Sequence, residues 1–357
     1  MFINIKLEKL PCSTEGPAQV RSATIHLTPT HFGIQLPATD ALRTGRFQVR
    51  EMAVEAERLG FDSVWVGDHL AFNAPVLESV VSATAAASVT DRVQVGFGVL
   101  VGALRQPAWL GKQISSLQGL SGDRVELGLG VGGEFPHEWI AAEVPMPERG
   151  QRTDALLDAL PALLTGQRVA LGNPWNIDIP PLEPHGSLPP LWVGGRSDIA
   201  LRRAARHAAG WLGTWVDEAR VRSARDRLTG LLAPSDAPPR IGVQVLIDPE
   251  PDAAVARDNL RGFIDGIYRL PFDRIERYAC LGSTDEIAER LCGLVLAGAS
   301  TVIFMPGTPD PLRALDGLAE VRERVRQALQ QSDEQGKRPQ ESGADTDSMK
   351  PSGLAGS

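Results

Sequence analysis

The chain has 357 residues, a formal net charge of −8 and hydrophobic side chains at 43% of its positions. A chain of this length and composition can form one large globular core or two ordinary ones. The negative charge gives no basis for nucleic-acid binding, which needs a basic face. No apolar run approaches the roughly 18 residues of a membrane span, so no membrane partner is expected.

The two ends of the chain lack the pattern of folded elements. Residues 1–30 show no signal-peptide pattern and are expected to be an extension that adds a short strand near Ala23–Leu27. Residues 331–357 contain no aromatic and no β-branched aliphatic residue. This tail cannot offset its ordering entropy and is expected to be disordered.

The cysteines argue against a metal site. Cys12, Cys280 and Cys292 lie far apart and form no CxxC pair, so neither a zinc site nor a disulfide framework is predicted. This cysteine usage favours a reducing, cytoplasmic location. The histidine and acidic residues form no recognisable ligand set either, and no metal is expected.

Between the two ends, short apolar segments alternate with amphipathic ones. Strands are predicted at 32–37, 62–67, 93–100, 124–132, 188–195, 211–215, 241–247 and 300–306. Strands that are apolar on both faces and joined by helices indicate a parallel sheet. Eight such units in roughly 300 residues predict a closed (β/α)8 TIM barrel over residues 31–330. The Pro- and Gly-rich segment 167–190 is predicted to be an insertion after the fourth strand.

The second predicted strand ends on the sequence Gly-Asp-His. In a parallel barrel the chemistry sits at the C-terminal ends of the strands, so Asp68 and His69 are candidate functional residues. A structural reading is also open, in which Asp68 caps the next turn and His69 bonds to backbone.

Glycines follow the fourth predicted strand. Gly132 and Gly133 would let a flat ring or a backbone segment approach closely, with Glu134 at the rim. The alternative is that these glycines only permit a tight turn.

The fifth predicted strand ends on two glycines directly before a helix. Gly194 and Gly195, with the positive end of that helix, form a plausible phosphate cradle to which Thr214 would donate its hydroxyl. Ser197 or Asp198 as a helix N-cap is an alternative, and both readings can hold together.

Several long segments together resemble a known family. They are AERLGFDSVWVGDHL (56–70), QPAWLGKQISSLQGLSGDRVELGLGVGGE (106–134) and PPLWVGGRSDIALRRAARHAAGWLGT (189–214). Their order is similar to that in the bacterial luciferase-like superfamily, and closest to its deazaflavin (coenzyme F-420)-dependent oxidoreductases. The resemblance covers about residues 32–328 and implies a barrel that binds a flavin or deazaflavin at its C-terminal mouth.

The resemblance also implies roles for individual residues. The catalytic residues would be His69, beside the cofactor ring, and Glu134, which would handle a proton. Gly98–Val99 matches a non-prolyl cis peptide behind the ring. The implied cofactor-binding residues are Asp68, Gly98, Val99, Gly132, Gly133, Gly194, Gly195 and Thr214.

Two departures bear on the substrate. The family's sugar-phosphate dehydrogenases have a tryptophan soon after the histidine and a lysine after the sixth strand, where this chain reads LAFNAP and TWVDEA. A sugar phosphate is therefore not expected. The expected substrate pocket is apolar and consists of Leu70, Phe72, Leu104, Phe135 and Trp139.

Three functions follow from these observations. The first is hydride transfer between coenzyme F-420 and a small, rather apolar organic substrate. The second is an FMN-dependent monooxygenase, in which a partner flavin reductase supplies reduced FMN and O2 is the oxidant. The third is a flavin-binding barrel without turnover. The resemblance further implies a homodimer.

Overall fold

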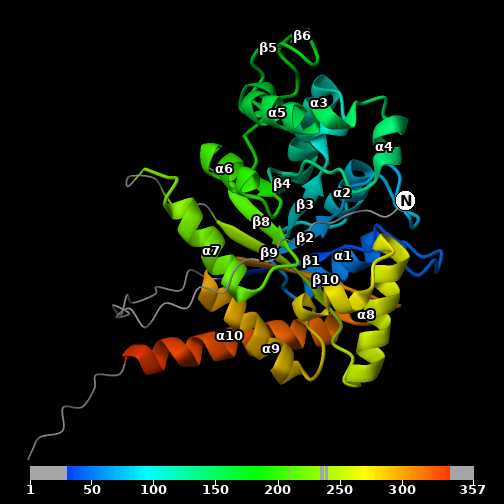
Figure 1. Cartoon of the computed structure of the whole chain (residues 1–357), viewed down its shortest axis with the longest axis vertical. Coiled ribbons are helices and arrows are strands. Elements are labelled where there is room, and N and C mark those ends of the chain that lie inside the picture. Colours follow the sequence, from blue (N-terminus) through cyan, green and yellow to red (C-terminus); the bar gives the residue numbers. More distant parts are fainter. Residues whose placement is uncertain (1–29, 208, 234–236, 238–239, 338–357) are drawn as a thin grey trace, which may run out of the picture.

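The computed structural model describes residues 30–337, except 208, 234–236 and 238–239. Within this part of the chain, eight parallel strands close a barrel in the order β1-β10-β9-β8-β7-β4-β3-β2 (Figure 1). The strands are β1 (His31–Gln35), β2 (Ser63–Val66), β3 (Gln94–Leu100), β4 (Val125–Leu129), β7 (Leu191–Gly194), β8 (Gly210–Thr214), β9 (Ile241–Ile247) and β10 (Thr301–Pro306). Each corresponds to a predicted strand, so the predicted barrel is confirmed.

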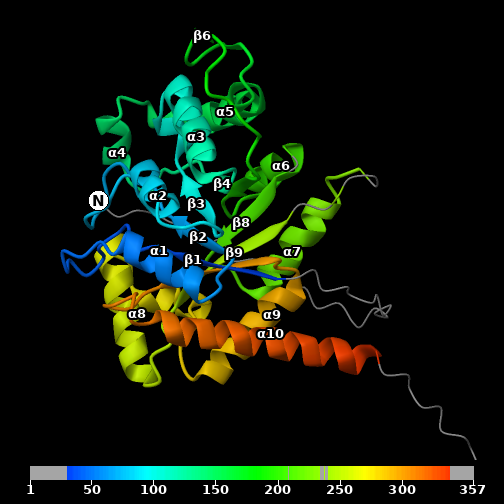
Figure 2. The same ribbon diagram turned by 180° about the vertical axis from the view of Figure 1, so that it is seen from behind.

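Helices surround the barrel on the outside (Figures 1 and 2). They are α1 (Val49–Arg58), α2 (Ser79–Ala87), α3 (Pro107–Ser121), α4 (Pro136–Ala141), α5 (Arg149–Leu164), α6 (Asp198–Arg206), α7 (Glu218–Thr229), α8 (Ala253–Tyr268), α9 (Thr284–Ala297) and α10 (Leu315–Lys337). Short 3₁₀ turns lie at Gly102–Leu104, Met146–Glu148, Phe272–Arg274 and Glu276–Tyr278.

Local sequence signals set several helix ends. The side chain of Gln106 accepts the Trp109 N–H, Pro107 opens α3, and Gly122 ends that helix in the left-handed region at φ 67°. A capping box between Ser283 and Glu286 begins α9.

The predicted insertion contains a small hairpin. Strands β5 (Val169–Leu171) and β6 (Ile177–Ile179) pair antiparallel between α5 and β7. Their buried side chains pack against Ala159 and Leu163 of α5. The hairpin lies beside α5 at the top of Figure 1, on the opposite side of the barrel from α10.

Two tryptophans fill the interior of the barrel. Trp65 of β2 and Trp192 of β7 are buried and meet edge to face, with ring centroids 6.1 Å apart. Neighbouring strands leave room for them, because a Cβ on Gly96 would lie 2.3 Å from Trp65 and one on Gly210 would lie 2.3 Å from Trp192. The glycine at position 96 in β3 is thus explained by packing, and these tryptophans occupy the space beneath the strand ends.

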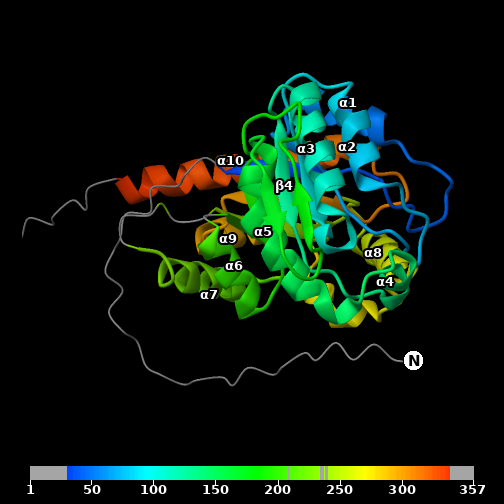
Figure 3. The ribbon, with the colours of Figure 1, turned by 90° about the horizontal axis from the view of Figure 1, so that it is seen from above.

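The ends of the described chain differ partly from expectation. Helix α10 continues to Lys337 and projects beyond the barrel (Figure 3), so the folded region extends past the predicted boundary at residue 330. The predicted strand at Ala23–Leu27 and residues 338–357 lie outside the described residues. No helix in the described part of the chain is long and apolar enough to cross a membrane.

Candidate active site

A cavity of about 410 Å³ opens at the C-terminal ends of the barrel strands. Its walls include residues at the ends of β1, β2, β3, β4, β7, β8 and β10. The β1–α1 segment, α4 and α8 gather on the same side of the molecule (right in Figure 1), and the first and last of these contribute to the wall. A cavity of this size is typical of a small-molecule site.

Most of the residues predicted for the site line this cavity. They are Asp68, His69, Phe72, Gly98, Val99, Gly132, Glu134, Phe135, Gly194, Gly195 and Thr214. The segments that carry them are distant in the sequence, and the barrel brings them to one mouth.

Three predicted pocket residues and one predicted cofactor contact do not line the cavity. Leu70 is 55% exposed and lies outside the cavity wall. Trp139 and Leu104 instead pack together in a separate apolar cluster around Val101 and Ala103. Gly133 lies against Arg149, whose Nε would be 3.0 Å from an added Cβ.

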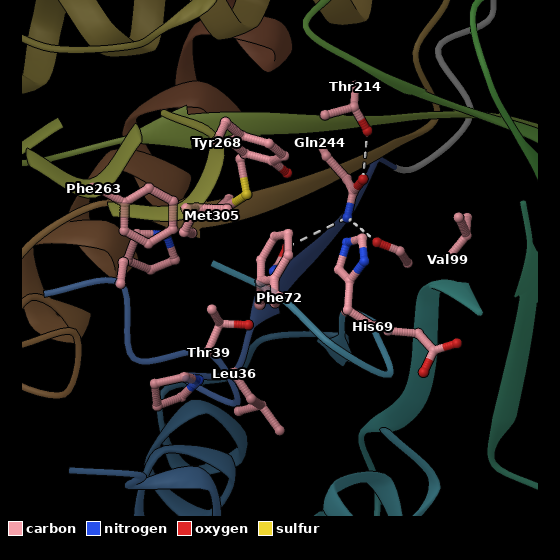
Figure 4. A pocket seen from close by; sticks show the side chains of 18 of the residues that line it. Leu36, Thr39, His69, Phe72, Val99, Thr214, Gln244, Phe263, Tyr268 and Met305 are labelled. Carbon is pink, nitrogen blue, oxygen red and sulfur yellow. Dashed lines mark hydrogen bonds between the residues drawn. The ribbon is translucent and has the colours of Figure 1, made fainter. Parts of the chain in front are cut away.

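The imidazole of His69 is held from several directions. Its Nδ1 lies 3.3 Å from Oε2 of Glu138. Phe72 stacks on the ring at 3.9 Å between centroids with an interplanar angle of 9°, and Phe135 meets it edge-on at 5.2 Å. Figure 4 shows His69 and Phe72 side by side in the cavity wall. The ring therefore has little freedom to turn.

Glu138 is a residue that the sequence analysis missed. Its carboxylate is completely buried, and Oε2 also accepts the Leu70 N–H at 3.2 Å. Glu138 lies four residues after Glu134, and this closeness in the sequence is the one local signal that it could share the site.

The carboxylate of Asp68 is engaged in structural hydrogen bonds within the protein. It accepts from Arg105 at 2.6 and 2.7 Å, from the Ser79 hydroxyl at 2.8 Å and from the Val101 N–H at 2.7 Å. Although burial opposes ionisation, the Arg105 guanidinium holds the pKa of Asp68 below its ordinary value. With both oxygens engaged, this carboxylate links β2 to the segment after β3, and a contact between Asp68 and a cofactor stays a prediction.

Strand β3 bulges at the centre of the cavity. The Gly98–Val99 peptide is cis, as predicted, and the register with β4 shifts between Phe97 and Leu100. The amide of Gln244 on β9 donates to the Gly98 carbonyl at 2.7 Å and so holds the bulge from the opposite side of the barrel. Gln244 was not predicted.

The same glutamine determines what Thr214 can do. The amino group of Gln244 faces Gly98, so its oxygen faces Thr214 and accepts the threonine hydroxyl at 2.6 Å (Figure 4). Because the hydroxyl proton is already donated, Thr214 can offer only an acceptor to the cavity. The predicted donation from Thr214 to a phosphate is therefore not supported.

The glycine pair after β7 lies at the start of α6. Ser197 caps this helix by accepting the Ala200 N–H, so the N-cap reading is confirmed. The Gly195 N–H is directed to the Leu212 carbonyl at 3.4 Å. Arg196 lines the cavity beside the positive end of α6. These cationic groups, rather than the Gly195 N–H, would attract an anion here.

Aromatic rings continue from His69 around the cavity wall. Tyr268 meets Phe72 edge-on at 5.9 Å and Trp215 at 4.9 Å. We call His69, Phe72, Tyr268 and Trp215 the aromatic wall. Burial and the nearby Glu134 carboxylate raise the pKa of the Tyr268 phenol above its ordinary value, so it stays protonated.

Other apolar side chains extend this surface. Figure 4 shows Phe263 and Met305 beside Tyr268, with Leu36 and Thr39 on another side of the cavity. The buried Nε1 of Trp215 has no hydrogen-bond partner within the described residues. Within those residues, no group of three or more His, Cys, Asp or Glu side chains could hold a metal ion.

Comparison with known proteins identifies the family. Residues 25–277 match the model of the luciferase-like monooxygenase family. The chain belongs to this family. The predicted resemblance is thereby confirmed.

Curated relatives add names within the family. An uncharacterized protein of Mycobacterium tuberculosis is 33% identical over 45% of this chain and 63% of its own length. An F420-dependent glucose-6-phosphate dehydrogenase of Nakamurella multipartita is 29% identical over 52% of this chain and 56% of its own length. The matches thus span less than two thirds of either relative.

Solved structures of low sequence identity share the fold. An F420-dependent secondary alcohol dehydrogenase, in complex with an F420–acetone adduct, superposes with a TM-score of 0.70 at 17% identity and covers 84% of this chain and 99% of its own. The FMN-bound oxygenating component of 3,6-diketocamphane monooxygenase of Pseudomonas putida superposes with a TM-score of 0.65 at 16% identity, over 83% and 98%. These likenesses show the barrel fold.

Proposed function

We propose that this protein is an oxidoreductase that transfers a hydride between coenzyme F420 and a small, rather apolar organic molecule. The observation that carries the proposal is the convergence at one cavity of three features. They are the constrained His69, the β3 bulge at Gly98–Val99, and the cationic end of α6 at Arg196.

The residues present fit a deazaflavin. The bulge at Val99 would support one face of a flat ring, and Arg196 with the N-terminus of α6 would hold the phosphate. Arg196 lies over the ring of Trp215, 5.9 Å from its centroid. When bound, the coenzyme would supply or accept the hydride, and the protein would supply orientation and proton transfer.

His69 is the residue we assign to proton transfer. An imidazole can act as acid or base near neutral pH, and Nδ1 is occupied by Glu138, which leaves Nε2 for the substrate. Glu134 also lines the cavity and would be a second group that handles a proton or accepts a hydrogen bond. Tyr268, which stays protonated, would donate a hydrogen bond.

The aromatic wall supports an apolar substrate. Trp215 stands in the segment where the sugar-phosphate dehydrogenases have a lysine, and its ring packs against Tyr268. Although one relative is named a glucose-6-phosphate dehydrogenase, this surface suits a flat or aliphatic alcohol or carbonyl compound better than a sugar phosphate.

A second candidate is a monooxygenase that uses reduced FMN and O2. It is supported by the FMN-bound monooxygenase of the same fold, and the end of α6 would hold the phosphate of FMN in the same way. This activity would require a flavin reductase as partner. The third function, flavin binding without turnover, does not explain why His69 is so closely constrained.

Binding titrations of the purified protein with F420 and with FMN, each oxidised and reduced and followed by fluorescence, test the proposal. We expect F420 to bind more tightly than FMN in both redox states. Selective binding of reduced FMN would instead support the monooxygenase. Binding of neither coenzyme would contradict both functions and the role given to Arg196.

We further propose that the protein is a homodimer in the cytoplasm. Helices α2 and α3 expose large apolar side chains, with Val81 67%, Trp109 69% and Leu120 73% accessible. Burying such a surface against a second copy would stabilise a dimer. A reducing compartment agrees with Cys280 and Cys292, which form no disulfide within the described residues.

A further inference from the structure

Glu138 is buried in an unusual way for an acidic residue. Its side chain has no exposed surface, and within the described residues it has no ion pair with a lysine or arginine. Oε1 has no hydrogen-bond partner among the described residues, and Oε2 has only His69 and the Leu70 N–H. Burying a carboxylate so sparsely paired is unfavourable, so this arrangement requires an explanation other than stability.

The contacts of Glu138 favour one direction for its hydrogen bond with His69. Oε2 accepts the Leu70 N–H at 3.2 Å and therefore presents lone pairs to its neighbours. When Glu138 is ionised it offers no proton, and the imidazole then donates from Nδ1 across the 3.3 Å separation. The stacked Phe72 and the edge-on Phe135 prevent the ring from turning over and exchanging its nitrogens.

We propose that Glu138 is a positioning residue that acts through His69. It keeps Nδ1 protonated and thereby presents Nε2 to the substrate. In the oxidation direction, Nε2 would take the proton of a substrate hydroxyl while the carbon would lose its hydride to coenzyme F420, and in reduction the proton would return to the oxygen and the hydride to the carbon. The carboxylate balances the positive charge that forms on the imidazole. This inference rests on the proposed function only for the identity of the substrate group.

The tautomer of His69 tests the inference without any coenzyme. The chain has six histidines, and the His69→Ala variant identifies the signals of His69 in 15N-labelled protein. In the wild-type protein, the ring is expected to carry its proton on Nδ1 when neutral. Glu138→Leu should shift the proton toward Nε2. Glu143→Gln, which removes an exposed charge just beyond α4, should leave the wild-type tautomer. A neutral wild-type ring protonated on Nε2, or the same tautomer in Glu138→Leu, would overturn the proposal.

Glu138→Ala keeps the test decisive if the leucine variant does not fold. This smaller side chain removes the acceptor for Nδ1 altogether, so the population of His69 protonated on Nδ1 should fall. An unchanged tautomer in Glu138→Ala would then contradict the proposal.

Turnover provides a second readout. For Glu138→Gln we expect kcat to fall by about 10²-fold or more, with coenzyme binding unchanged, because the charge that balances the imidazolium is lost. A normal kcat would refute the positioning role. If no variant and no wild-type protein transfers hydride, the proposed function fails, whereas the tautomer result still decides the role of Glu138.

Discussion

His69 shows how the site depends on single side chains from separate elements. It follows β2, while Glu138 on α4 and Phe135 before that helix constrain it from more than 60 positions later in the chain. Such a ring is already oriented before a substrate arrives, which is what general acid–base catalysis requires.

His69→Ala tests this orientation at the level of one residue. Removing the imidazole should reduce turnover by about 10²–10⁴-fold, because proton transfer to or from the substrate is lost. Coenzyme affinity should change little, since the end of α6 remains. Steady-state kinetics and a fluorescence titration measure the two effects. Unchanged turnover would exclude His69 as the proton-transfer group.

The limits of sequence reasoning are also clearest at this scale. His69, Gly132, Gly194 and Gly195 could be predicted as residues of the cavity because each stands at or just after the C-terminal end of a strand, where local pattern and barrel geometry suffice. Glu138 and Gln244 could not, because their partners His69 and Gly98 lie 69 and 146 positions away. Trp139 was misplaced because the sequence does not tell which side of α4 faces the cavity.

At the level of elements, buried hydrogen bonds and ion pairs between separate strands and loops shape the cavity. Asp68 joins the end of β2 to Arg105 and to Val101 after β3, and Gln244 joins β9 to the bulge of β3. The eight strands themselves were predictable, since each is a continuous apolar run. The hydrogen bonds that link the strands were not predictable, because they depend on strand register and on the cis peptide.

Asp68→Asn should weaken the ion pair with Arg105 that links β2 to the segment after β3. Breaking a buried pair of this kind costs about 3–5 kcal/mol of unfolding free energy. Because Arg105 lowers the pKa of Asp68 in the folded state, its contribution is complete above the unfolded pKa of about 3.9 and is lost as the pH falls through the lower folded value.

Urea unfolding of both proteins between neutral and acidic pH checks this prediction. The difference in unfolding free energy should be constant near neutral pH and shrink in acid. Asp178→Asn, which breaks an exposed pair with Arg168, should have little effect. A difference that grows in acid would contradict the assignment.

Gly194→Ala should disturb the packing of β7 against the β3 bulge. The new Cβ would lie 2.7 Å from Cγ1 of Val99 and must displace that side chain within the cavity. We expect coenzyme affinity to fall by about tenfold or more, equivalent to roughly 1.4 kcal/mol. Gly119→Ala on α3, where the new Cβ meets nothing within 4 Å, is the matched control and should bind normally. Equal binding by the two variants would show that Val99 does not support the ring.

At the scale of the whole molecule, the cavity lies at the mouth of the barrel and the exposed apolar side chains lie on its outer helices. The proposed dimer would therefore leave the barrel interior unchanged. Light scattering during size-exclusion chromatography should give the mass of two chains for the wild-type protein. Trp109→Glu should reduce that mass to one chain, because a charge on a buried dimer face is unfavourable. A monomeric wild-type protein would refute the proposed interface.

Whether the reaction needs oxygen distinguishes hydride transfer from monooxygenation most directly. Reduced F420 and reduced FMN would each be mixed anaerobically with the protein and a panel of small apolar ketones and aldehydes, and the coenzyme absorbance followed. Hydride transfer predicts that reduced F420 is reoxidised with stoichiometric formation of alcohol in the absence of O2. Turnover that appears only with reduced FMN and O2, with oxygen incorporated into the product, would contradict the proposed function.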